Sequence, residues 1–98
     1  MIYLIIYDIS SDRIRNRISK RLISEGYLRI QLSVFVGISD PSENTLLWNM
    51  LNLWLSDEEY SKLFVIAITK NKFRSMPKIG TLEYDIDYLL GEKHTMII

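Results

Sequence analysis

The chain has 98 residues, no cysteine, and 12 acidic side chains balanced by 12 lysines and arginines. This length fits a single domain over residues 1–98 with one hydrophobic core. The lack of cysteine excludes a disulfide framework and a thiolate metal site, so a cytoplasmic location is expected. The apolar N-terminal run meets a charge after seven residues, too early for a signal peptide or a membrane span, and no membrane association is expected.

The net charge of zero conceals a segregation of charge along the chain. Residues 1–39 carry six basic and three acidic groups, whereas residues 40–62 carry five acidic groups against Lys62 alone. Blocks of opposite sign create surfaces of opposite sign when the fold keeps them apart. The overall balance therefore does not exclude a nucleic-acid-binding surface in the N-terminal part.

The first predicted element is a strand at residues 2–7, where apolar and tyrosine side chains follow one another without a helical period. The next residue, Asp8, closes this strand. Ser10 or Ser11 then caps a helix over residues 12–25, and Gly26 provides a left-handed stop after it.

This helix has an apolar face and a basic face. Ile14, Ile18 and Leu22 recur every four residues and are expected to pack on the sheet. A neighbouring stripe carries four cations, and a fifth lies on the other flank: Arg13, Arg17, Lys20 and Arg21, with Arg15 apart. The stripe is either a solvated helix face or a surface that binds phosphates without reading sequence, because no aromatic platform is interleaved with it.

Residues 27–39 alternate, so that Arg29 and Phe35 share one face, and they form either one long strand or two short strands bent near Leu32. A second helix is expected to open at Asp40, with Pro41 in its first turn, and to end near residue 56. A third apolar stretch, residues 62–69, predicts a strand followed by a basic turn and loop.

The order of these elements predicts an α+β, ferredoxin-like βαββαβ sandwich with both helices on one face of the sheet. On this interpretation Tyr3, Tyr7 and Phe35 face water on the other side, and a second copy of the sheet covers them in a homodimer. Residues 94–98 predict an extra C-terminal strand. Its apolar residues, Ile97 among them, either pair with the partner subunit or pack on their own subunit.

Three motifs carry a resemblance to a known family: "YDIS" closing the first strand, arginines on the next helix, and "RIQLSVFVG". Together they resemble the CRISPR-associated endoribonuclease family, the small dimeric partner of the CRISPR spacer-acquisition integrase. The likeness is dense over residues 1–37 and thinner afterwards. The matching positions are Tyr7, Asp8, Arg15, Arg17, Arg29 and Phe35. The family often has lysine or arginine where this chain has Leu32.

The resemblance implies a homodimer with facing sheets, in which Asp8 of each chain lies at the interface and holds Mg²⁺ as the catalytic metal ligand. It also implies cleavage of single-stranded RNA or duplex DNA, and a role as the bridge of the integrase complex. Residues expected to bind nucleic acid are Arg13, Arg15, Arg17, Lys20, Arg21 and Arg29. Those expected at the dimer interface are Tyr7, Phe35 and Ile97.

The residues alone leave other interpretations open. Asp8 can equally accept amide hydrogen bonds at the start of the following helix and take no part in chemistry. A ferredoxin-like regulatory module that binds a small ligand, and a stand-alone VapD-like toxin ribonuclease, share the predicted fold.

Overall fold

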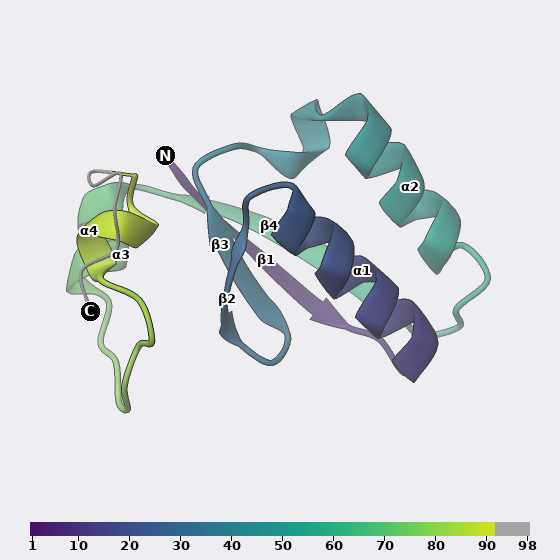
Figure 1. Ribbon diagram of the computed structural model, residues 1–98, viewed down its shortest axis with the longest axis horizontal. Coiled ribbons are helices and arrows are strands. Elements are labelled where there is room, and N and C mark those ends of the chain that lie inside the picture. Colours follow the sequence, from purple (N-terminus) through teal and green to yellow (C-terminus); the bar gives the residue numbers. More distant parts are fainter. Residues whose placement is uncertain (92–98) are drawn as a thin grey trace.

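A computed structural model describes residues 1–91 of the chain. Its four strands form one antiparallel sheet in the order β2-β3-β1-β4. They span β1 Ile2–Asp8, β2 Leu28–Gln31, β3 Val34–Gly37 and β4 Lys62–Ile68. Two long helices, α1 Asp12–Ser24 and α2 Thr45–Leu55, lie side by side over one face of this sheet (Figure 1). The predicted ferredoxin-like arrangement is confirmed.

The main core lies between the sheet and these two helices. Alternate residues of a strand point to opposite faces, and Ile5 and Tyr7 of β1 point toward α1. They pack there against the predicted apolar stripe of the helix, Ile14, Ile18 and Leu22, all buried. Burying one such side chain fully contributes about 1.5–3 kcal/mol, so this stripe fixes α1 on the sheet.

The helix starts are set by small polar side chains. Ser11 Oγ accepts a hydrogen bond from the Ile14 amide at 3.3 Å and caps α1. Asp40 was expected to open the second long helix, but it caps only the short 3₁₀ turn η1, Pro41–Glu43. Asn44 caps α2, its Oδ1 accepting from the Leu47 amide at 3.1 Å. Two helical segments, η1 and α2, each with its own cap, therefore replace the single helix that the sequence predicts.

Residues 28–37 form two short strands and not one long strand. The chain turns at Leu32 and Ser33, and the β2–β3 register shifts between Arg29 and Gln31. Arg29 lies opposite Phe35 across this hairpin. The turn coincides with Leu32, the predicted bend.

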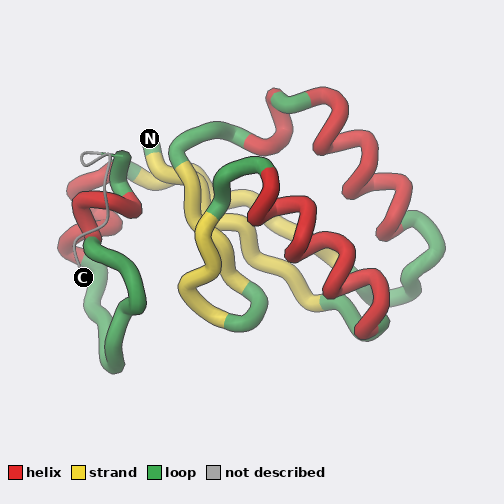
Figure 2. Tube along the Cα trace, viewed as in Figure 1, coloured by secondary structure: helices red, strands yellow, loops and turns green. Residues whose placement is uncertain are grey.

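Helical turns replace the turn and loop predicted after β4. These are α3, Lys70–Ser75, and α4, Ile86–Leu89, which gather at one end of the sheet, away from α2 (Figures 1 and 2). Phe73, Leu89 and Leu90 pack there on the second face of the sheet, against Ile2 and Leu4. This segment covers the part of that face near the start of β1. The predicted strand at residues 94–98, including Ile97, lies outside the described residues.

The prediction that Tyr7 and Phe35 face water is wrong. Both lie in the core under α1 and α2, with 3% and 0% of their surfaces exposed. The prediction assigned these two side chains to the wrong face of the sheet. The residues that alternate with Tyr7 along β1, Ile6 and Asp8, are the ones that point to the second face. Neither ring is available for the dimer contact expected of it. The open part of the second face carries Ile6, Phe64 and Ile66 instead, with 60% of Phe64 and 44% of Ile66 exposed.

The start of the hairpin is anchored by Tyr27. Its hydroxyl donates to the Ser39 carbonyl at 2.6 Å, and its ring lies against Gly37, where an added Cβ would come within 2.4 Å of the ring. Burial, assisted by the carboxylates of Asp40 and Glu25, raises the pKa of Tyr27 to about 12. Among the described residues, no helix has the length and apolar character that crossing a membrane requires.

Candidate functional site

Asp8 is the last residue of β1 and is exposed to solvent. Its carboxylate makes no hydrogen bond and no ion pair with any described residue. The cap of the following helix is Ser11, so the interpretation of Asp8 as a capping carboxylate does not apply. An unpaired carboxylate at a strand end is free to bind a cation.

A pocket of about 410 Å³ opens beside Asp8 and is lined by residues from β1, α1 and the β2–β3 hairpin. Its lining residues are Asp8, Ile9, Arg15, Asn16, Arg29, Leu32 and Ser33. Arg15 and Arg29 bring two guanidinium groups to this pocket, so two of the predicted nucleic-acid-binding residues meet Asp8 at one site. Guanidinium groups match the geometry of phosphate oxygens.

Both arginines of this pocket are held in place. The Arg15 guanidinium donates to the Ile9 carbonyl at 2.9 Å and also pairs with Asp12. The Arg29 guanidinium lies over the ring of Phe35, 5.2 Å from its centre. Phe35 thus supports the pocket from within the core.

Tyr7 fastens the hairpin side of the pocket. Its hydroxyl donates to the Leu32 carbonyl at 3.3 Å, and its amide donates to the Ser33 carbonyl at 3.1 Å. Its ring also stacks on Phe35 with 6.2 Å between the centres. Tyr7 and Phe35 therefore position the pocket and do not line it.

The remaining predicted cations lie along α1. Arg13 and Lys20 are exposed and make no ion pair with a described residue. The Arg17 guanidinium lies 5.6 Å from the centre of the Trp54 ring, at the end of α2. Arg21 is half-buried and pairs with Glu25 at 2.9 Å, so its charge is already compensated. The stripe is thus divided between free cations and cations that join α1 to its surroundings.

One cation near Asp8 was not identified from the sequence. Lys62, the first residue of β4, is the cross-strand partner of Asp8 in the β1–β4 ladder. Only the pairing of the strands brings it there, since 54 positions, the difference between 62 and 8, separate the two in sequence. The available signal was that Lys62 is the one charged residue in the otherwise apolar strand Lys62–Ile68.

The donor set tests whether magnesium fits here. No group of three or more histidine, aspartate or glutamate side chains within residues 1–91 surrounds a common point. Mg²⁺ commonly keeps several waters and takes one or two carboxylates together with phosphate oxygens. Asp8 alone is too few, but a pair of Asp8 carboxylates from two copies, completed by phosphate and water, fits that preference.

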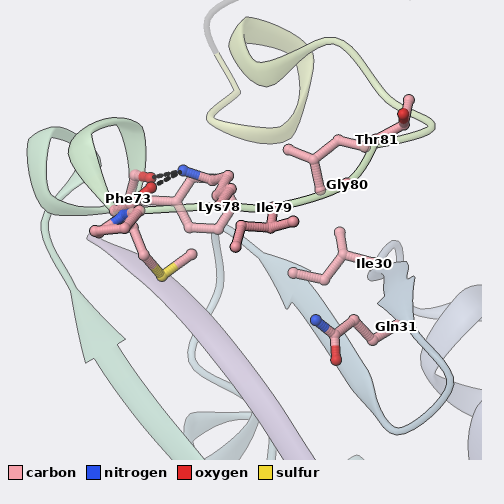
Figure 3. A pocket seen from close by; sticks show the side chains of 10 residues that line it. Ile30, Gln31, Phe73, Lys78, Ile79, Gly80 and Thr81 are labelled. Atoms are coloured by element: carbon pink, nitrogen blue, oxygen red, sulfur yellow. Dashed lines mark hydrogen bonds between the residues drawn. The ribbon is translucent and has the colours of Figure 1, made fainter.

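A second pocket, of about 430 Å³, lies between β2 and residues 76–82 (Figure 3). Its charged lining residue, Lys78, donates from Nζ to the carbonyls of Phe73 at 2.7 Å and Met76 at 2.9 Å. That ammonium caps the end of α3 and is occupied by these two carbonyls. Because the charged group of the second pocket has this structural role, we place the candidate site at Asp8.

The sheet order, the two helices on one face and the unpaired carboxylate beside arginines define a ferredoxin-like α+β protein whose exposed site is suited to phosphate. The family described as CRISPR associated protein Cas2 matches residues 1–76. A curated relative from Archaeoglobus fulgidus, named CRISPR-associated endoribonuclease Cas2 1, is 32% identical over 68 residues, covering 69% of this chain and 71% of the relative. The chain therefore belongs to the CRISPR-associated Cas2 family, as the sequence motifs predict.

A solved structure supports the same fold. The crystal structure of Streptococcus pyogenes Cas2 at pH 6.5 matches with a TM-score of 0.65 and 23% identity, covering 82% of this chain and all of that one. Family membership favours the CRISPR interpretation over the regulatory module and the VapD-like toxin.

Proposed function

We propose that the chain acts in CRISPR spacer acquisition as a homodimer that bridges integrase subunits, binds duplex DNA and cleaves nucleic acid with the help of Mg²⁺. The observation that carries the proposal is the unpaired Asp8 carboxylate, exposed at a strand end beside Arg15 and Arg29. The name of the A. fulgidus relative points to RNA as the substrate of cleavage.

The open part of the second sheet face supports the dimer. Ile6, Phe64 and Ile66 form an apolar surface there, on the same face as Asp8. A two-fold contact between two such surfaces is self-complementary, because each copy presents the same patch to the other. It would also bring the two Asp8 residues toward each other.

The chemistry assigned to the site is phosphodiester cleavage. A magnesium ion held by Asp8 would neutralise charge on the phosphate and activate a bound water. Arg15 and Arg29 would hold the phosphate oxygens, and their contacts with Ile9 and Phe35 reduce the side-chain entropy lost on binding. Leu32 and Ser33 complete the lining of this pocket on the hairpin side.

DNA binding is assigned to the outer side of α1, where Arg13 and Lys20 are exposed and Arg17 adjoins them. Cations on a helix surface contact phosphates and not base edges, so sequence-independent binding is expected. Such a surface suits a bridging protein that must accept spacers of any sequence.

Cleavage is tested with purified protein, a single-stranded RNA and a duplex DNA, each with Mg²⁺ or with EDTA. Cleavage should require Mg²⁺ and be lost in Asp8→Asn, while the folded state is retained. Cleavage at the wild-type rate in Asp8→Asn would show that Asp8 is not the catalytic ligand.

The bridging role is tested separately in cells that carry the integrase and a repeat array. Reversing the charges of Arg13, Arg17 and Lys20 together should abolish spacer acquisition. Normal acquisition by that triple variant would mean that this surface of α1 is only a solvated helix face.

A further inference from the structure

The antiparallel register sets Asp8 directly opposite Lys62 as the last pair of the β1–β4 ladder. Residues directly opposite in such a ladder place their side chains on the same face, with Cβ atoms about 4.5–5.5 Å apart. The two preceding pairs on this face are Ile6 with Phe64 and Leu4 with Ile66. An exposed carboxylate and an exposed ammonium thus lie together at the open end of the second face.

We propose that Lys62 is a second functional residue of the Asp8 site, whose ammonium binds a phosphate oxygen of the nucleic acid and, before nucleic acid arrives, weakens the binding of a divalent cation by Asp8. This inference rests on the proposed function and adds a residue to it. It predicts that cation and nucleic acid bind cooperatively.

Lys62 is the cation at this site with the most freedom to bind a ligand. Arg15 is engaged by Ile9 and Asp12, and Arg29 lies over Phe35. The Lys62 ammonium makes no hydrogen bond and no ion pair with any described residue. Its flexible stem and three donors are therefore available to a phosphate near Asp8.

The position of Lys62 does not suit a purely protective role. Within residues 1–91, β4 lies at the edge of the sheet, and lysines on edge strands commonly prevent unwanted pairing. A lysine at the first residue, however, leaves the six apolar residues of the strand that follow it without a charge. Proximity to Asp8 accounts for the position, whereas edge protection does not.

Electrostatics gives the expected size of the effect. An ammonium some 8 Å from a divalent cation, in a medium close to water and at low ionic strength, weakens cation binding by roughly fivefold. A phosphate that pairs with the ammonium removes this penalty. By linkage, the factor by which nucleic acid strengthens cation binding equals the factor by which the cation strengthens nucleic-acid binding.

The test measures Mn²⁺ binding by electron paramagnetic resonance in the absence of nucleic acid, with binding of a single-stranded RNA oligonucleotide in EDTA measured separately. Lys62→Gln should bind Mn²⁺ about fivefold more tightly and bind the RNA more weakly. Lys62→Arg, which keeps the charge, should behave as the wild type does in Mn²⁺ binding. Lys72→Gln is the matched control, since Lys72 is an exposed lysine on α3, and it should change neither quantity.

Two outcomes would overturn the proposal and are distinguishable. If the wild type binds Mn²⁺ through Asp8 but Lys62→Gln, in the same oligomeric state, has unaltered Mn²⁺ affinity, Lys62 has no part in the site. If the wild type and Asp8→Asn both fail to bind Mn²⁺, the metal site in the proposed function fails and this inference fails with it.

Discussion

Removing the two unpaired cations of α1 should weaken DNA binding in a way that depends on salt and leaves the fold intact. The change is the double substitution Arg13→Gln with Lys20→Gln. Both side chains are exposed and make no ion pair with a described residue, so the folded state loses no ion pair. Both lie on the outer side of α1, away from the buried stripe.

The magnitude follows from the number of phosphates that the two cations neutralise. Each contact with duplex DNA contributes about 0.9 to the slope of log K against log salt, so losing two lowers the slope by about 1.8 per chain. Between 50 and 200 mM salt the wild type should then lose roughly twelvefold more affinity than the variant does. If both chains of a dimer contact one duplex, the difference in slope doubles.

The assay is fluorescence anisotropy with a labelled duplex at four or five salt concentrations. Arg21→Gln is the informative control, because Glu25 already compensates that charge and the ion pair joins the end of α1 to the start of α2 through Asn44. It should lower thermal stability and leave the slope nearly unchanged. Equal slopes for the wild type and the double variant would refute the assignment of DNA binding to this surface.

Three further predictions concern the fold and the dimer. Gly37→Ala should destabilise the protein by about 1–3 kcal/mol in urea unfolding, because its Cβ would overlap the Tyr27 ring. The pKa of Tyr27 rises from its ordinary 10.0 to about 12 on folding. The contribution of Tyr27 to the free energy of unfolding is therefore fully present below pH 10 and should be lost as the pH rises toward 12. Tyr27→Phe should remove that fall, which pH-dependent melting would detect. Phe64→Lys, at the open face, should stay folded but yield a monomer in size-exclusion chromatography, with a lower melting temperature than the dimeric wild type.

The sequence predicted the elements whose residues repeat with a clear period. The spacing of Ile14, Ile18 and Leu22 located the buried side of α1, and the unbroken apolar run of residues 2–7 located the central strand. These patterns succeed because burial of one face is a local property of a helix or strand.

The predictions that failed depended on contacts between distant segments. Tyr7 and Phe35 share a face, as expected, but nothing in a strand with apolar residues on both sides says which face meets the helices. Likewise Lys62 joins Asp8 only through the pairing of β1 with β4. The helical turns after β4 are short, and packing of Phe73 on the sheet, more than local propensity, stabilises them.

The arrangement of the sheet separates the two proposed activities. Arg13 and Lys20 lie on the outer side of α1, which covers the face of the sheet that carries the main core, whereas Asp8 and Lys62 point to the opposite, second face. A helix about 10 Å across stands between those surfaces. On the proposed assignment, a duplex held by Arg13 and Lys20 would contact the outer side of α1, whereas a strand to be cut would reach Asp8 at the pocket that Arg15 and Arg29 also line. Different residues would then determine the affinity for duplex DNA and the rate of cleavage, so a substitution could lower one without lowering the other.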